Sequence, residues 1–404
     1  MIQYKNKLHL QITSLRKAGC IVNNLQVRDT NKKKIVNFLY TNNGATKQKI
    51  AKTLGLSMPT VSLILKELSA RGLVKKSGTL KSSGGRKPVV NSLAYDAYFS
   101  VGIEITQNHL RFVLINLGED ILHYKIIREH FQNNDAYYKK LADYLETFLA
   151  GSGIDRSLLL GIGIALPGLF NTKKNLLEYS PTLQVRNLPL GAITKYISYP
   201  VLANNEANLA GFAEIWHMDE VESAVFLSIN KGVGGSIIVG NKVFNGMNGR
   251  AGEFGHMTIV KDGLTCSCGK KGCLEAYCST QVLTEPNFTD VDEFFASLQM
   301  GNQYCMQKWE TYLDYLATGI NNLRTVFDSD IILGGEIVQY LKQYSDLLRR
   351  KLLPLNSFGE PLNYLHFSRY SDKASAIGAA LLLVDAFLSD DTIRPPRLNY
   401  SDSA

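Results

Sequence analysis

Three of the six cysteines in this 404-residue chain lie within one short stretch, CSCGKKGCLE, at residues 266–275. Cys266, Cys268 and Cys273 are soft ligands within reach of one ion, and His256 lies ten residues upstream in a loop-like Gly-His step. A Cys3His set suits tetrahedral Zn2+ and leaves no coordination position open for a substrate. We therefore predict a structural zinc site that joins two loops.

Other interpretations of these cysteines depend on the compartment. The start of the chain has no apolar segment typical of a signal peptide, and the sequence has no run of ~18 apolar residues that could span a bilayer. We expect a cytoplasmic protein with no membrane partner, in which thiols stay reduced. Free core cysteines and a redox pair are the alternatives, but a CxCxxxxC spacing is rarely accidental and the CxxC of dithiol enzymes is missing.

Positive charge is concentrated at one end of the chain. Residues 1–92 contain eighteen Lys and Arg but only two acidic residues, Asp29 and Glu67. The first segment thus has a net charge of +16, whereas the remaining 312 residues have a net charge of −8. Such a basic segment is typical of a domain that binds a polyanion.

The basic segment also has the hydrophobic pattern of a helix-turn-helix. One helix follows Lys32, Thr46 caps a second that ends at Gly55, and Ser57 caps a third. The stretch GLVKKSGTLKSSGGRKPVV is then typical of a two-stranded wing. We predict a winged helix-turn-helix domain, with a basic domain that binds no DNA as the alternative. The residues expected to contact double-stranded DNA are Lys47, Ser57, Met58, Thr60, Ser62, Lys66, Arg86 and Lys87.

Two later parts of the chain repeat one plan. Three strands are expected within residues 99–128 and three more within 222–245, each set followed by a helical pattern. This plan predicts an α/β protein with the actin-like (ribonuclease H-like) two-lobed sugar-kinase fold and a ligand cleft between the lobes. The expected boundaries are 1–27 for an arm or short helix, 28–93 for the winged domain, 94–390 for the kinase-like domain and 391–404 for a disordered tail.

Six motifs follow one another through the kinase-like part: GIGIALPG (161–168), NNEAN (204–208), GEFGHM (252–257), CSCGKKGCLE (266–275), ILGGE (332–336) and AIGAA (376–380). In this order, after a basic winged domain, they resemble the ROK family of sugar kinases and sugar-responsive repressors. The resemblance covers nearly all of residues 28–388, and the cysteine motif is its most specific part. The chain looks most like the family's xylose-repressor and NagC type of regulator.

The resemblance implies a binding site for a monosaccharide or a sugar derivative. Carboxylates and amides suit sugar hydroxyls, because each hydroxyl both donates and accepts hydrogen bonds. A vestigial or repurposed pocket is the alternative. The residues at the family's sugar-binding positions are Gly168, Asn205, Glu206, Glu253, His256 and Glu275.

Three departures from the family's kinase pattern predict a domain without catalysis. Glu206 stands where the kinases carry an aspartate base, and its extra methylene displaces the carboxylate. The first phosphate turn reads EITQN (104–108) in place of Asp-x-Gly-Gly-Thr, which puts side chains where backbone must approach phosphate. The second turn reads NKG (230–232) in place of Gly-Thr-Gly. We expect no ATP binding, no catalytic residue and a vestigial base at Glu206.

The function expected from these features is a sugar-responsive transcriptional regulator, a repressor of carbohydrate-utilisation genes. We expect it to bind operator DNA as a homodimer or a dimer of dimers, since paired half-sites suit paired domains. Two alternatives stay open: an active ATP-dependent sugar kinase with an attached DNA-binding domain, and a DNA-binding regulator controlled by a protein partner.

Overall fold

The computed structural model describes residues 24–79, 88–216, 218, 222–356, 359 and 361–389. They fall into two compact units, one formed by the described residues up to Ala97 and one formed by those from Tyr98 to Asp385. No helix in these ranges is long and apolar enough to cross a membrane. Most of the expected N-terminal arm, the wing tip with Arg86 and Lys87, and the expected tail lie outside the described residues.

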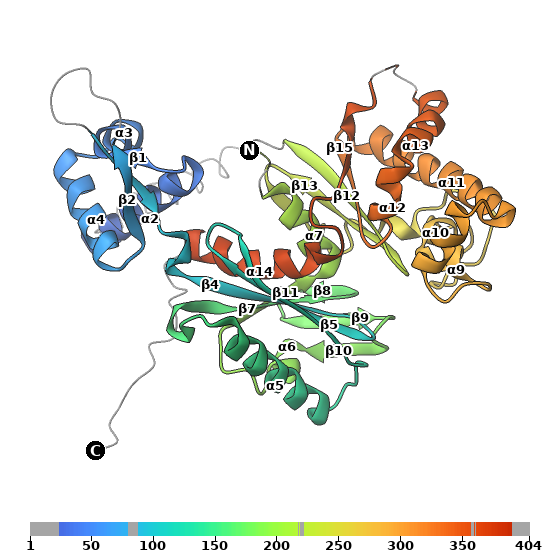
Figure 1. Cartoon of the computed structure of the whole chain (residues 1–404), viewed down its shortest axis with the longest axis horizontal. Helices are drawn as coiled ribbons and strands as arrows, with labels where there is room; N and C mark the ends of the chain where they lie inside the picture. The colour runs from blue at the N-terminus through green and yellow to red at the C-terminus, as the bar shows by residue number, and fades with distance from the viewer. Residues whose placement is uncertain are drawn as a thin grey trace, which may run out of the picture. The chain divides into compact units, whose positions relative to one another are not determined.

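The smaller unit combines three helices with a three-stranded sheet of order β1-β3-β2 (Figure 1). The antiparallel pair β2–β3 is the predicted wing. Strand β1 has only two residues, too few to show a sequence pattern, so it could not be predicted. The elements are α2 (Asn24–Thr41), β1 (Ala45–Thr46), α3 (Lys47–Leu54), α4 (Met58–Ala70), β2 (Val74–Thr79) and β3 (Val89–Leu93).

Side-chain caps begin helices α3 and α4 at the predicted residues. Thr46 Oγ1 accepts a hydrogen bond from Lys49 N at 3.2 Å, and Gly55 ends α3 with a φ of 64°. Ser57 Oγ accepts a hydrogen bond from Thr60 N at 3.2 Å and so caps α4. The buried face of α4 consists of Val61, Ile64, Leu65 and Leu68.

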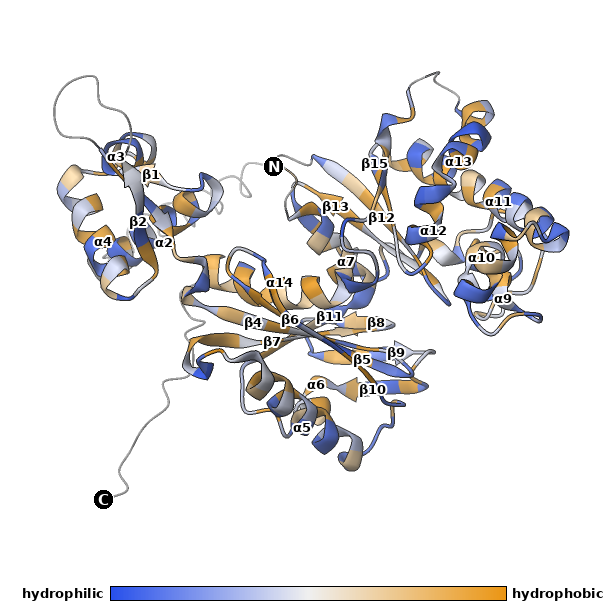
Figure 2. Ribbon diagram, in the orientation of Figure 1, coloured by the Kyte–Doolittle hydropathy of each residue, from blue (hydrophilic) through white to orange (hydrophobic). Residues whose placement is uncertain are grey.

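The larger unit begins with a five-stranded sheet of order β11-β7-β4-β5-β6. Helix α5 covers one face, where Phe148 lies 5.4 Å from Phe112 between ring centroids, and α14 covers the other face. Figure 2 shows α14 and strands β4 and β7 mainly in the hydrophobic colour, as expected for buried elements. The elements are β4 (Phe99–Ile105), β5 (His109–Asn116), β6 (Ile121–Arg128), α5 (Asp135–Ser152), β7 (Leu159–Leu166), β11 (Val201–Asn205) and α14 (Ala374–Ser389).

A second five-stranded sheet has the order β14-β13-β12-β15-β16. Helix α7 packs on the face that presents Ala224 and Phe226, and helices α8 to α13 belong to the core on the opposite face, with Val225 and Leu227. The strands are β12 (Ser223–Ile229), β13 (Val233–Val239), β14 (Lys242–Phe244), β15 (Asp330–Gly334) and β16 (Leu365–Phe367). The helices are α7 (Glu206–Ile215), α8 (Glu275–Cys278), α9 (Thr280–Thr284), α10 (Val291–Gln299), α11 (Gln303–Phe327), α12 (Val338–Gln343) and α13 (Ser345–Leu352).

A small third sheet has the order β10-β9-β8 and follows the GIGIALPG motif (161–168) in the chain. This sheet was not apparent from the sequence pattern. Helix α6 lies next to it in sequence. The elements are β8 (Leu169–Asn171), β9 (Leu176–Ser180), β10 (Val185–Pro189) and α6 (Leu190–Ile193).

Glycine contacts hold the two large sheets to a shared pair of helices. A Cβ added at Gly102 or Gly163 on the first sheet would lie 1.8 Å from a carbonyl oxygen of α14, that of Ala376 or Ala379. A Cβ at Gly378 of α14 would lie 1.9 Å from the Leu209 carbonyl oxygen of α7. Because α7 packs on the second sheet, this chain of close contacts joins the two lobes. The predicted two-lobed α/β fold is thus confirmed.

Replacing Gly102 with alanine should destabilise the larger unit. The added methyl group overlaps the Ala376 carbonyl oxygen, and overpacking of this kind costs about 1 to 3 kcal/mol or more. Urea unfolding measures the change. The control is Gly151→Ala on α5, whose new Cβ would have its nearest neighbour at 3.8 Å. Because alanine is the better helix former, that variant should be as stable as the wild type or more so.

Candidate metal centre and ligand site

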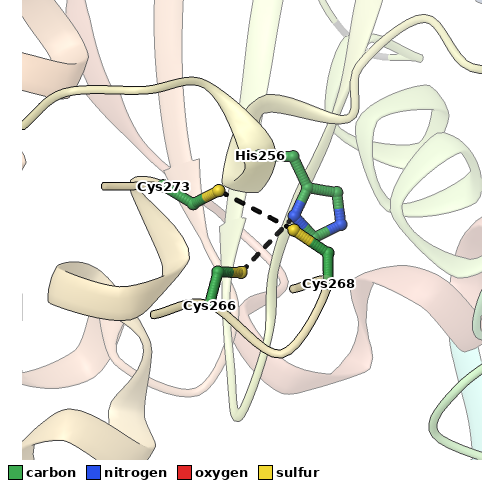
Figure 3. Close-up of side chains that lie close together, drawn as sticks. All are labelled: His256, Cys266, Cys268 and Cys273. Atoms are coloured by element: carbon green, nitrogen blue, oxygen red, sulfur yellow. Dashed lines mark hydrogen bonds between the residues drawn. The ribbon is translucent and has the colours of Figure 1, made fainter. Parts of the chain in front are cut away.

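The four predicted metal ligands come together in the structure. The ligand atoms of His256, Cys266, Cys268 and Cys273 all lie within 4.8 Å of one another. Cys268 Sγ lies 3.8 Å from Cys273 Sγ, and His256 Nδ1 lies 3.7 Å from Cys266 Sγ. Figure 3 shows the four side chains pointing toward one another. A β-bridge between Thr258 and Cys273 holds the two contributing loops side by side. These four side chains could hold a metal ion.

His256 has a different partner at each ring nitrogen. Its Nδ1 faces the Cys266 sulfur, and its Nε2 lies 3.9 Å from Glu253 Oε2. A carboxylate beside the far nitrogen of a metal-ligating histidine fixes the tautomer and orients the ring. The two roles predicted for His256, in metal binding and in sugar binding, are therefore compatible because each role uses one nitrogen.

The three thiols of the cluster differ in pKa. Burial raises the pKa of Cys273 to about 12 and also raises the pKa of Cys266. A hydrogen bond from the backbone of Lys270 lowers the pKa of the exposed Cys268. Cys268 therefore loses its proton most readily and offers the first thiolate to an approaching cation.

Glu275 connects the cysteine loop to the turn between β12 and β13. Its Oε1 accepts a hydrogen bond from the Ser267 hydroxyl at 2.7 Å, and its Oε2 accepts one from Val233 N at 3.0 Å. The Cys266 sulfur lies 3.6 Å from Oε1. Oε1 thus has two protein donors, whereas Oε2 has one and keeps capacity for a further hydrogen bond.

The other predicted sugar-binding residues form a second group at the start of α7. Asn205 Oδ1 accepts a hydrogen bond from Asn208 N at 3.0 Å, and Asn205 Nδ2 donates one to the Gly168 carbonyl at 2.7 Å. Gly168 has a φ of 105°, and a Cβ there would lie 2.3 Å from the Tyr179 carbonyl oxygen, so only glycine fits. Among the described residues, no hydrogen bond or ion pair joins this group to the group at the cysteine loop.

Glu206, the first residue of α7, lies near a buried ion pair that the sequence analysis misses. Arg111 Nη1 on β5 donates to Glu104 Oε2 on β4 at 2.6 Å, and the two residues are direct cross-strand partners. The pKa of Glu206 is raised to about 8. Loss of water around the carboxyl group is the largest cause, the Glu104 carboxylate also raises the pKa, and Arg111 opposes the rise. With this pKa Glu206 is mostly protonated at neutral pH, and a protonated carboxyl group cannot act as a general base.

A signal for this ion pair does exist in the sequence. Glu104 and Arg111 are charged residues within the otherwise apolar strands FSVGIEI and LRFVLIN, on either side of one turn. Buried charges of opposite sign at such positions are expected to pair, because an isolated buried charge is costly. Predicting the contact also requires the register that places Glu104 opposite Arg111, and this register depends on the length of the turn between the two strands.

The turn between β4 and β5, the first phosphate turn of the family's kinases, is closed by its own hydrogen bonds. Thr106 Oγ1 donates to the His109 carbonyl and accepts from His109 N, both at 3.0 Å, and Thr106 N donates to the same carbonyl at 2.9 Å. The carbonyls of Gln107 and Asn108 accept hydrogen bonds from the segment that follows β6. These hydrogen bonds engage the N–H groups of Thr106 and His109 and the carbonyls of Gln107, Asn108 and His109.

On α4, the two hydroxyls expected to read bases already have partners. Thr60 Oγ1 lies 2.8 Å from Ser57 Oγ, within the helix cap, and Lys47 Nζ donates to Ser62 Oγ at 3.4 Å. The expected residues Met58 and Lys66 are exposed, and so is Leu63, which was absent from the predicted set. The exposed residues of α4 are Met58, Pro59, Leu63, Lys66, Ser69 and Ala70.

A winged helix-turn-helix unit followed by a two-lobed sugar-kinase fold defines a DNA-binding regulator built on a kinase scaffold. The chain belongs to the ROK family, which matches residues 100–386. Its N-terminal part matches the family described as winged helix-turn-helix DNA-binding over residues 28–75. The predicted family and fold are therefore confirmed.

Proteins similar to this chain include regulators and kinases. The "Xylose repressor" of Caldicellulosiruptor bescii is 26% identical over 392 residues, which cover 91% of this chain and 98% of the relative. A "Glucokinase" of Halalkalibacterium halodurans is 26% identical over 263 residues, 59% of this chain and 80% of the relative. A crystal structure described as a ROK family transcriptional regulator, homolog of E. coli MLC protein, has a TM-score of 0.73 at 24% identity and covers 90% of this chain and 98% of its own. The relatives that match nine tenths of the chain are regulators.

Replacing Glu206 with glutamine should flatten the pH dependence of stability. The folded protein binds a proton at Glu206 up to a pKa of about 8, whereas the unfolded chain releases it near 4.5. The free energy of unfolding of the wild type should therefore fall as the pH rises from about 5 to about 8. The variant should lack this component of the slope, as urea unfolding across that range would reveal. The exposed Glu222→Gln is the control, and parallel curves for wild type and Glu206→Gln would contradict the assignment.

Proposed function

We propose that this protein is a sugar-responsive transcriptional repressor whose kinase-like domain senses a sugar without phosphorylating it. The observation that carries the proposal is the combination, on one ROK chain, of a basic winged helix-turn-helix domain with a kinase-like site whose base is protonated and whose first phosphate turn is closed. The domain boundaries at 28–93 and 94–390 are part of the proposal.

Operator DNA is the partner of the winged domain. The net charge of +16 over residues 1–92 supplies the attraction to phosphates, and α4 is the helix that enters the major groove. Lys47 and Lys66 contact phosphates at its two sides, while Arg86 and Lys87 at the wing tip reach the minor groove or a phosphate. The chain acts as a homodimer or a dimer of dimers, because two winged domains match two operator half-sites.

Zinc is the ion that suits the cysteine cluster. A regular tetrahedron with Zn–S bonds of about 2.3 Å has edges of about 3.8 Å. The Cys268–Cys273 sulfur distance of 3.8 Å and the His256–Cys266 distance of 3.7 Å agree with such edges. Because four protein ligands saturate a tetrahedral zinc, the ion has a structural role and clamps the loop of His256 to the cysteine loop.

The sugar ligand is bound by residues of both groups described above. Glu253 keeps 42% of its side chain exposed, and the protein around its carboxylate still raises its pKa by desolvation. Glu275 retains one acceptor position, on Oε2. Asn205 holds Gly168 in place and has one amide hydrogen left for a hydroxyl. Glu206 adds a neutral carboxyl group, which can donate a hydrogen bond to a sugar oxygen.

Three features support the proposal that the protein transfers no phosphoryl group: the two altered phosphate turns and the residue at the base position, Glu206. At a pKa of about 8 most Glu206 side chains are protonated at neutral pH and cannot take the proton from an attacking hydroxyl. Closure of the first turn engages the N–H groups of Thr106 and His109, which are then not available to a phosphate. In the second turn, Asn230 N donates to the Gly232 carbonyl at 2.9 Å, and Asn230 Oδ1 accepts from Glu336 N at 2.8 Å. This turn is thus tied to the strand-to-helix turn that carries the ILGGE motif.

Sugar binding and DNA binding are coupled by thermodynamic linkage. A sugar that favours one state of the protein weakens DNA binding if the operator favours the other state, and each ligand changes the affinity for the other by the same factor. A coupling of ~2 to 3 kcal/mol is enough to move the operator from mostly bound to mostly free. Glu275 is suited to transmit the coupling, because it touches the cysteine loop and the β12–β13 turn together.

Replacing Cys273 with serine should remove the zinc and lower the thermal stability. Elemental analysis of the purified wild type should find about one zinc per chain, and the variant should hold almost none. The loss of even part of the ~10 to 16 kcal/mol available from zinc binding should lower the Tm markedly. The control is Cys305→Ser, which also alters a buried cysteine but lies outside the cluster and should keep its zinc. Full zinc retention in Cys273→Ser would refute the site.

Glu253→Gln should weaken sugar binding while the metal content stays normal. The wild type should gain ~2.7 kcal/mol of stability at a hundredfold excess of a true ligand over its Kd, seen as a thermal shift, and the variant should gain much less. Xylose, the sugar in the name of the relative from Caldicellulosiruptor bescii, is the first to test in a panel of sugars and sugar phosphates. The exposed Glu222→Gln is the matched control.

The decisive experiment combines DNA, sugar and ATP. The full chain is used to select duplexes from a random library, and the sugar that shifts the Tm is then added to the complex. Release of the DNA supports the proposal. ATP-dependent phosphorylation of the sugar, lost in Glu206→Gln, would instead identify an active kinase with an attached DNA-binding domain. A flat thermal response to the whole panel would favour a regulator controlled by a protein partner.

A further inference from the structure

Leu63 is an apolar residue on the outward face of α4. Of its surface, 55% is exposed, whereas the helix residues that pack on the domain core are 0–3% exposed. At about 100° per residue, Leu63 lies opposite this buried face, with Pro59 and Lys66 as its neighbours one turn away. The core-facing residues of α4 are Val61, Ile64, Leu65 and Leu68.

The polar side chains around Leu63 are already engaged. The Thr60 hydroxyl lies within the helix cap, 2.8 Å from Ser57 Oγ, and the Ser62 hydroxyl accepts a hydrogen bond from Lys47. A hydroxyl that already has a protein partner has less capacity to discriminate between bases. Leu63 is therefore an exposed apolar side chain in the middle of a face whose two hydroxyls, those of Thr60 and Ser62, already have hydrogen-bond partners.

The charge next to Leu63 is favourable for DNA. Glu67, one turn after Leu63, is neutralised by Lys32 at 2.6 Å and Arg28 at 2.7 Å, and the hydrogen bonds of these two residues hold the pKa of Glu67 below its usual value. No unpaired acidic group in the described part of α4 therefore repels a phosphate. Lys66 is exposed beside Leu63 and adds positive charge to the same face.

We infer that Leu63 is a specificity-determining residue that recognises thymine through its 5-methyl group in the major groove. The methyl group of thymine is the apolar group that the major-groove edges of the four base pairs display. Residues in the first half of the second helix of a helix-turn-helix are the ones that reach base edges, and Leu63 is the sixth residue of α4. A single exposed leucine elsewhere on a surface would have no such meaning. The inference rests on the proposed DNA binding.

The experiment uses the full chain and the duplexes that it selects from a random library. Each thymine of a selected duplex is replaced in turn by deoxyuridine, which lacks only the methyl group, and Kd is measured at one fixed salt concentration. We expect one thymine per half-site at which the replacement weakens wild-type binding roughly fourfold, the value for burial of one such carbon. Leu63→Ala should bind the thymine and uracil duplexes equally.

Two controls separate this role from a general effect. Val27→Ala removes an apolar side chain of similar exposure (44%) from α2 and should keep the discrimination against uracil. Because Leu63 is exposed, Leu63→Ala should keep the wild-type Tm. The uracil scan of the wild-type protein tests thymine recognition even if the variant fails to fold. Tolerance of uracil at every thymine, or discrimination that persists in Leu63→Ala, would overturn the inference and leave DNA binding intact. Selection of no duplex would instead disprove the proposed function.

Discussion

The carboxylate of Glu275 connects more parts of the site than any other single group described. One oxygen accepts from Ser267 in the cysteine loop, and the other accepts from Val233 at the start of β13. The loop of His256 is attached to the same cysteine loop by the β-bridge to Cys273. Two loops that are separate in the chain and one turn of the second sheet thus share a fixed geometry. In the proposed site, a ligand bound near Glu275 would therefore also act on the β12–β13 turn and on the cysteine loop.

The first phosphate turn and the buried Glu104 beside it both make contacts within the protein. A phosphate turn must leave backbone N–H groups free for the ligand, whereas the β4–β5 turn uses Thr106 to satisfy its own groups. Glu104 has a guanidinium partner in Arg111, so the charge of this buried carboxylate is balanced within the protein. Both changes stabilise the ligand-free site. A site that is satisfied by itself has less to gain from a nucleotide, which agrees with a sensor more than with an enzyme.

Much of the local structure could be predicted from particular residues. Thr46 and Ser57 are caps with a defined hydrogen-bond geometry, and both make the expected bonds. The stretches FSVGIEI (99–105), LRFVLIN (110–116) and ESAVFLSI (222–229) lie where strands were expected, and the observed strands begin and end within one residue of them. The four metal ligands were predictable because their residue types and spacing are specific to metal binding. By contrast, β1 and the small third sheet have short strands whose pairing depends on distant partners.

The sequence by itself determined the features that depend on residues close together in the chain. These features are the helix caps, the strand patterns, the basic N-terminal segment, the residue types of the candidate metal ligands and the altered phosphate turns. Only the tertiary structure decided which of these residues meet. The pairing of Glu104 with Arg111, the proton on Glu206 and the bridge made by Glu275 all depend on strand register and burial. The pKa of a carboxyl group and the partner of a charge are set by distance and solvent access, and these quantities do not exist until the chain has folded.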